Sequence, residues 1–357
     1  MSLINKPIAR REFLRLGGHC AAVSMLAGPL VACAQDEGGV YVGSRRAPVI
    51  DIHAHCAFAE VIELLEGTPI NWPLSEIRLL GPKRLEDMAA RRIDTQVLSI
   101  NQYWWYAADK ALAHDIVRLH DEKLKAWCDQ HEDQFAALSS VALQHPELAA
   151  EQLEYAVNEL GLRGASIGGH VNGIVPSGEE FDPFWAKAEE LGVPVFVHPN
   201  GAQNVVRENS LDGRGSLENI IGNPLETTVF LTKMIFDGTL DRFPGLVVVG
   251  AHGGGYLPSY LGRTEVACEY RGDANCANQR RPSEYLHDQI VVDTMVFSHA
   301  GLRHLHEEMG ASQIVFGTDI PFNWPDTLDL VLEAEYLSDD DKIAILGGNL
   351  QRLLKLT

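Results

Sequence analysis

The 357-residue sequence lacks several features that would assign it to a specialised class of protein. It contains no C-x-x-C motif, which argues against a structural zinc site built from cysteines. Positive charge is also scarce, because 29 Lys and Arg residues stand against 49 Asp and Glu residues, for a formal net charge of −20. Nucleic acids and anionic membranes bind positive surfaces, so we expect neither as the main partner. The hydrophobic content of 46% is sufficient for a sizeable core.

Cysteine is sparse as well. Two of the six cysteines lie in the first 34 residues, and Cys268 and Cys276 are separated by seven residues. In an oxidising compartment the last two would form a disulfide. Two free, buried thiols fit the sequence equally well, so both alternatives stay open.

Residues 1–34 are predicted to be a Tat-type export signal, which implies a periplasmic protein. Arg10 and Arg11 form a twin-arginine pair, and an apolar stretch follows at 21–32. This stretch is shorter than the roughly 20 residues that a transmembrane helix needs. The signal ends either by cleavage after Ala34 or at a lipobox that would leave Cys33 lipidated and anchored to a membrane. Residues 35–47 are then expected to be a linker.

From residue 48 to residue 357, apolar β-branched runs alternate with segments of helical periodicity, without a repeat or charge block that would divide them. The predicted helices are 83–92, 107–131, 146–160, 182–191, 224–237, 256–270 and 298–309. The predicted strands are 49–53, 95–100, 135–143, 164–167, 193–198, 246–251, 289–293 and 313–317. Apolar runs of this kind are typical of parallel strands that are covered on both faces. Eight such units in one domain favour an α/β fold of the (β/α)8 TIM-barrel type.

Polar side chains gather where the predicted strands end. His53 and His55 close the first strand and, being two residues apart, share one face of it. His198, His252 and Asp319 close the fifth, sixth and eighth strands. A barrel brings all carboxyl ends of its strands to one rim, and the long loop 200–223 is expected to lie over that rim. Nitrogen and carboxylate donors of this kind suit Zn²⁺ and also accept Mn²⁺, Fe²⁺ or Co²⁺.

With these motifs the chain resembles the amidohydrolase superfamily, in the branch of aminocarboxymuconate-semialdehyde decarboxylase. The segments that carry the resemblance are 51–55, 160–172, 196–199, 223–228, 243–255 and 316–322.

The resemblance implies one divalent metal ion, with zinc preferred, held by His53, His55, His198 and Asp319. It implies His252 as the catalytic acid/base, with Asp319 also at the reaction centre. Many members of the superfamily hold a second metal through a carboxylated lysine on the fourth strand, but residues 164–168 contain no lysine. The sequence therefore predicts a mononuclear site.

Four further residues are candidates for binding a small carboxylate substrate. Arg263 and Arg271 match arginines of the decarboxylase branch, and the resemblance implies that such residues reach the site of a neighbouring subunit in a homodimer. Surface arginines in ion pairs are the alternative. Arg78 is a candidate third anchor, although the stretch around it departs from the family pattern, and His170 is a candidate pocket residue. The aromatic residues at 72 and 103–106 fit either a flat substrate or ordinary packing at the rim.

The resemblance thus implies a metal-dependent decarboxylase, a carbon–carbon lyase, for a small aromatic or unsaturated carboxylic acid. The alternative on the same scaffold is a hydrolase of a lactone, ester or amide.

Overall fold

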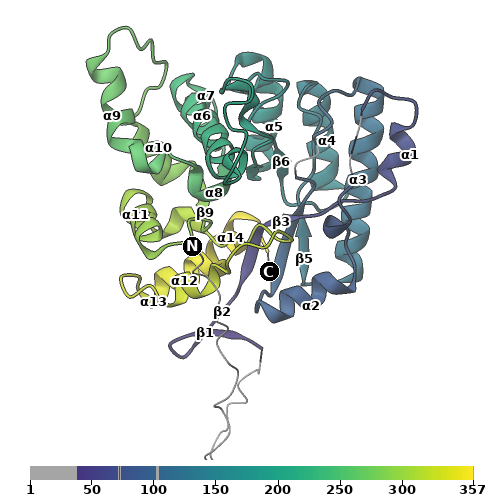
Figure 1. Cartoon of the computed structure of the whole chain (residues 1–357), viewed down its shortest axis with the longest axis horizontal. Coiled ribbons are helices and arrows are strands. Elements are labelled where there is room, and N and C mark those ends of the chain that lie inside the picture. The colour runs from purple at the N-terminus through teal and green to yellow at the C-terminus, as the bar shows by residue number, and fades with distance from the viewer. Residues whose placement is uncertain (1–37, 71, 73, 102–103, 357) are drawn as a thin grey trace, which may run out of the picture. The chain divides into compact units, whose positions relative to one another are not determined.

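Eight parallel strands form the centre of the computed structural model, which describes residues 38–70, 72, 74–101 and 104–356 (Figure 1). Each overlaps one of the eight predicted strands, and almost every residue in them is buried. They are β3 (Ile50–His55), β4 (Thr95–Ser99), β5 (Phe135–Ala137), β6 (Ala165–Ile167), β7 (Val195–Val197), β8 (Val248–Gly250), β9 (Ile290–Asp293) and β10 (Ile314–Val315). The predicted signal, with Cys33, lies outside the described residues.

Backbone hydrogen bonds close these strands into a barrel. The ladders run β3-β4-β5 and β10-β9-β8-β7-β6. Ser166 N donates to Ser139 O at 2.8 Å, which joins the segment after β5 to β6. Ile52 N donates to Phe316 O at 3.1 Å, which joins β3 to the end of β10. The first and last strands are therefore neighbours, and the predicted TIM-barrel fold is confirmed.

Helices surround the barrel, and most of them follow a strand as predicted (Figure 1). The larger ones are α2 (Pro82–Ala90), α3 (Lys110–Gln130), α4 (Pro146–Asn158), α5 (Asp182–Leu191), α6 (Asn223–Phe236), α9 (Leu261–Tyr270), α10 (Pro282–Asp288) and α11 (His299–Met309). The shorter ones are α1 (Val61–Leu65), α7 (Thr239–Arg242), α8 (Ala251–Gly254), α12 (Leu328–Leu332), α13 (Asp339–Ile343) and α14 (Asn349–Leu353). Among the described residues, no helix is both long enough and apolar enough to cross a membrane.

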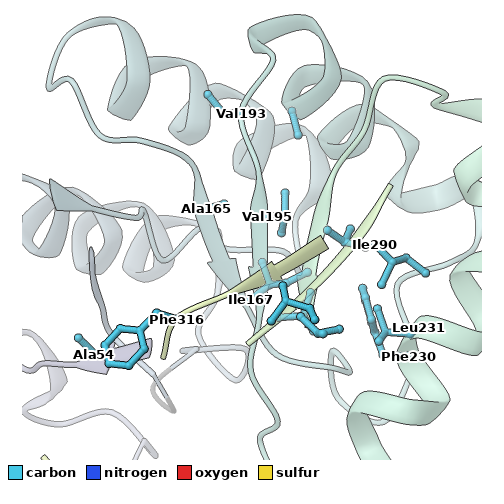
Figure 2. Close-up of a cluster of buried hydrophobic side chains, with 14 of the residues drawn as sticks. Ala54, Ala165, Ile167, Val193, Val195, Phe230, Leu231, Ile290 and Phe316 are labelled. Carbon is cyan, nitrogen blue, oxygen red and sulfur yellow. The ribbon is translucent and has the colours of Figure 1, made fainter. Parts of the chain in front are cut away.

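The core fills the space between the barrel and its helices. Figure 2 shows Phe230 and Leu231 of α6 in one apolar cluster with strand residues such as Ile167 and Ile290. All four are at most 1% exposed. Burying each such side chain contributes roughly 1.5–3 kcal/mol, so this packing keeps the strand ends in fixed positions.

The stretch expected as a linker contains an ordered hairpin. β1 (Val40–Val42) pairs with β2 (Arg45–Ala47) in antiparallel register. Val40, Val42 and Ala47 are buried in the main core cluster, so this part of the chain packs onto the barrel domain. Cys268 and Cys276 form a disulfide. This is the first of the two alternatives that the sequence left open for these cysteines.

His120 of α3 is a buried histidine outside the site described below. It is fully buried and stacks on Trp105 with ring centres 5.5 Å apart. Neither ring nitrogen has a hydrogen-bond partner among the residues that the structure describes. Burial lowers the pKa of His120 from 6.5 to about 3, so the folded state keeps it neutral while the unfolded chain protonates it.

This difference predicts acid sensitivity. The stabilising contribution of neutral His120 is complete above pH 6.5 and is lost as the pH falls towards 3, by about 1.4 kcal/mol per pH unit. We expect His120→Phe to weaken the pH dependence of the free energy of unfolding, measured by urea unfolding of metal-free protein at several pH values. His114→Phe, at an exposed position on the same helix, is the control. An unchanged pH dependence in His120→Phe would contradict the assignment.

Candidate metal centre and its cavity

Four buried side chains converge at the carboxyl ends of the barrel strands. His53 and His55 come from β3, while His198 and Asp319 follow β7 and β10. One donor atom of each lies within 4.8 Å of the corresponding atom of every other. This is the only group of three or more such residues found in the described part of the chain. The structure therefore assembles the predicted His/His/His/Asp cluster, which is suited to one divalent metal ion.

Each of the three histidines is oriented through its Nδ1 atom. The acceptors are Asp293 Oδ2 for His53 at 2.7 Å, Asn101 O for His55 at 3.0 Å and Pro199 O for His198 at 2.8 Å. An Nδ1 atom held in this way fixes the ring and leaves Nε2 for a metal. The Nε2 atom of His53 is buried and makes no hydrogen bond among the described residues, although Asp319 Oδ1 lies 3.2 Å away. A buried polar atom without a partner fits a metal ligand.

The electrostatics of the cluster also fit a cation. Burial alone would lower the pKa of His53, but the negative charges of Asp319 and Asp293 outweigh it and raise the pKa to about 10. Burial alone would raise the pKa of Asp319, but His53 and His55 hold it well below its usual value. The cluster thus stabilises a positive charge between carboxylates, which a divalent metal would supply.

Two buried carboxylates outside the predicted set of site residues support the ligands. Asp293 ends β9 and accepts from His53. Asp51, also in β3, accepts from Thr318 N at 3.0 Å and from Thr318 Oγ1 at 2.6 Å, next to Asp319. Asp293 lies at the carboxyl end of its strand, so the rule that selected the ligands would have found it. Asp51 lies near the amino end of β3, and only the alternation that places it on one face with His53 and His55 points to it.

A cavity of about 410 Å³ opens beside the cluster. It is lined by Arg78, His198, Ser216, Asn219, Asn223, His252, Asp319, Phe322, Asn323 and Trp324. Three of these residues come from the loop 200–223 and the start of α6, which confirms that this loop lies over the active face. The cavity is large enough for a small ligand and combines aromatic walls with amide groups.

His252 stands between the cluster and the cavity. Its ring centre lies 5.2 Å from that of His53 and 5.3 Å from that of His198. Its Nδ1 atom has no hydrogen-bond partner among the described residues. Burial, with a further contribution from His53, lowers the pKa of His252. The predicted proton carrier is therefore adjacent to the ligands and open to the cavity.

Of the predicted substrate residues, Arg78 lines the cavity and His170 does not. Arg78 is buried, lines the cavity and lies 5.2 Å from the ring centre of Phe322. His170 is outside the cavity lining. Its Nε2 faces Gly201 O at 3.2 Å and its Nδ1 accepts from Gly173 N at 3.1 Å, so it orders the loops around it.

Arg263 lies on α9 and Arg271 just after it. Both are exposed and outside the cavity lining, and Arg271 pairs with Asp273 at 2.8 Å.

The predicted aromatic residues lie in two different places. Trp104 is buried with its ring centre 6.1 Å from that of His198, while Trp105 packs against Trp72 and His120. The aromatic walls of the cavity, Phe322 and Trp324, come instead from the segment after β10.

Comparison with known proteins places this architecture in a family. A family model described as amidohydrolase matches residues 50–356. The chain is 31% identical over 278 residues to 2-amino-3-carboxymuconate-6-semialdehyde decarboxylase of Dictyostelium discoideum, covering 76% of each chain.

Two solved structures share the fold. The 5-carboxyvanillate decarboxylase of Sphingomonas paucimobilis has a TM-score of 0.80 at 23% identity, covering 87% of this chain and 100% of the other. A dihydroxybenzoic acid decarboxylase of Polaromonas, with bound manganese and 2-nitroresorcinol, has a TM-score of 0.74 at 26% identity, covering 87% and 97%.

The cluster predicts the metal content of the purified protein. We expect about one equivalent of divalent metal per chain by elemental analysis, because one cluster supplies four donors. His55→Ala and Asp319→Ala should each lose most of the metal, whereas His114→Ala, at an exposed position on α3, should retain it. Two equivalents per chain would contradict a mononuclear site.

Proposed function

Because the chain belongs to the amidohydrolase family, we propose that it is a metal-dependent decarboxylase of a small aromatic or unsaturated carboxylic acid. One observation carries this proposal. One cavity is lined by two residues of the donor cluster, His198 and Asp319, together with His252 and a buried arginine, Arg78. These are the groups needed to hold a carboxylate and to deliver a proton. The similar proteins named above are decarboxylases of such acids, which supports the assignment.

The proposed roles follow from position. A bound metal supplies Lewis acidity that polarises a substrate oxygen. Arg78 pairs with an anionic oxygen, since guanidinium groups bind carboxylates in a fixed geometry. Phe322 and Trp324 contact the flat part of the substrate. The three histidines and Asp319 would hold the metal, and the depressed pKa of Asp319 keeps this carboxylate ionised for that task.

His252 carries the proton in this scheme. When the bond between the carboxylate and its carbon breaks, CO2 leaves and the bonding electrons remain on that carbon. The carbon must gain one proton, so that R–COO⁻ and H⁺ give R–H and CO2. His252 lines the cavity, so its ring can hold that proton and pass it to the substrate carbon.

Zinc is the proposed metal, because three imidazole nitrogens and one carboxylate oxygen match its preferred ligands. The same donors accept manganese, which the Polaromonas structure contains. Elemental analysis after growth without added metal identifies the ion that the protein acquires.

The reaction is tested by its product. With 5-carboxyvanillate and a dihydroxybenzoic acid as trial substrates, we expect release of CO2 and of the acid's decarboxylated product. His252→Ala should keep its metal and lose about 10²- to 10⁴-fold in kcat, because the proton carrier is removed.

His114→Ala is the control, because His114 is exposed on α3 and outside the cavity lining. Normal turnover by His252→Ala would refute its role. Cleavage of an ester, lactone or amide without CO2 release would instead establish the hydrolase alternative.

Arg263 and Arg271 support a proposed homodimer. Arg263 is exposed on α9 and Arg271 is exposed just after it, and α9 also exposes Val266 and Tyr270, the latter at 75%. Exposed aromatic and arginine side chains are typical of interfaces. In this arrangement the two arginines would serve the cavity of the partner, since they do not line their own.

Export to the periplasm is also proposed, with either cleavage after Ala34 or lipidation of Cys33. The twin-arginine pattern supports it, and so does the Cys268–Cys276 disulfide, because disulfides persist in oxidising compartments. We expect the double change Arg10→Lys and Arg11→Lys to retain the protein in the cytoplasm, as measured by cell fractionation. Lys6→Arg is the control, and unaffected export of the double variant would refute the signal.

A further inference from the structure

We propose that Asp293 is a positioning residue that holds the metal ligand His53 and the proton carrier His252 in one fixed relation. The role of His252 in this inference rests on the proposed function. Asp293 is fully buried at the end of β9 and uses both carboxylate oxygens. Oδ2 lies 2.7 Å from His53 Nδ1, while Oδ1 accepts from Gly253 N at 2.8 Å and from Met295 N at 3.1 Å.

The bond to Gly253 acts on His252 through the backbone. The N–H of Gly253 belongs to the peptide that follows His252, so its direction is set by the ψ angle of His252. His252 has φ 56° and ψ 46°, a left-handed conformation that is unfavourable for a residue other than glycine. A buried carboxylate that accepts from the next N–H offsets this cost and fixes the direction of the His252 side chain.

The residues after His252 are restricted by their backbone conformation and by close packing. Gly253 and Gly254 are also left-handed, with φ values of 63° and 73°. A Cβ atom on Gly253 would lie 2.5 Å from Val296 Cγ1. The close approach of Val296 therefore requires glycine at position 253. Two hydrogen bonds hold the turn, one from Gly253 N to Asp293 Oδ1 and one within the turn from Gly255 N to His252 O at 3.1 Å.

The fold explains why one carboxylate reaches both partners. β8 and β9 are parallel neighbours, with Gly250 opposite Val292. The turn after β8 thus lies beside the end of β9, where Asp293 stands. The other oxygen faces His53, whose ring centre is 5.2 Å from that of His252. Asp293 is the short link between the ligand and the proton carrier.

The variant Asp293→Asn tests the link to His53 separately from the link to the turn at His252. Its amide oxygen can still accept from Gly253 N, but an NH2 group cannot accept from His53 Nδ1. We expect the dissociation constant of the metal, measured by competition with a chelator, to rise about 10- to 100-fold. Hydrogen–deuterium exchange of the peptide spanning 250–256 should stay as in the wild type. Wild-type metal affinity in this variant would overturn the link to His53.

Asp293→Ala removes both links. Exchange of the 250–256 peptide should increase in this variant, with kcat reduced further than in Asp293→Asn at saturating metal while KM changes little. Asp51→Asn is the control, because this carboxylate anchors Thr318 instead and should leave exchange at 250–256 unchanged. Unchanged exchange in Asp293→Ala would overturn the link to His252. Metal affinity and exchange need no substrate, so they judge this inference even where the decarboxylase proposal fails.

Discussion

The site depends on the seam where the last strand of the barrel meets the first. Ile52 N bonds Phe316 O across this seam, and Asp51 accepts from both the backbone and the hydroxyl of Thr318. These bonds bring Asp319 to within 2.8 Å of His55 Nε2, although 264 positions separate the two residues. Burial raises the pKa of Asp51 to about 6, and the bonds from Thr318 and His53 partly offset that cost. Without closure of the barrel the four donors would not share one centre.

Much of this arrangement follows from the sequence because it obeys two periodic rules. Side chains two apart on a strand share a face, and parallel strands of a barrel end at one rim, so His53, His55, His198 and Asp319 were predictable as a group. The resemblance to a family then separated His252 from the ligands. The fold was predictable for the same reason, since each buried strand leaves an apolar run.

The parts that escaped prediction lie where no periodicity applies. The aromatic walls of the cavity, Phe322 and Trp324, follow β10 in an irregular segment, and the direction of their side chains depends on tertiary packing. His170 stands near the rim in sequence, but backbone partners engage both of its nitrogens. The hairpin at residues 40–47 has strands of three residues, which are too short to show an alternating pattern.

Asp51 and Asp293 show how buried carboxylates of the fold support the residues of the metal centre. Each accepts a backbone N–H beside a residue with positive φ, Thr318 before Asp319 and Gly253 after His252. The strain of the positive-φ conformations of Asp319 and His252 is thus offset by hydrogen bonds to buried carboxylates and by packing in the barrel. In small zinc domains the metal itself supplies the folding energy. Here hydrogen bonds within the barrel orient the ligand histidines. A bound metal would add stability by mass action, about 2.7 kcal/mol at a hundred times the dissociation constant.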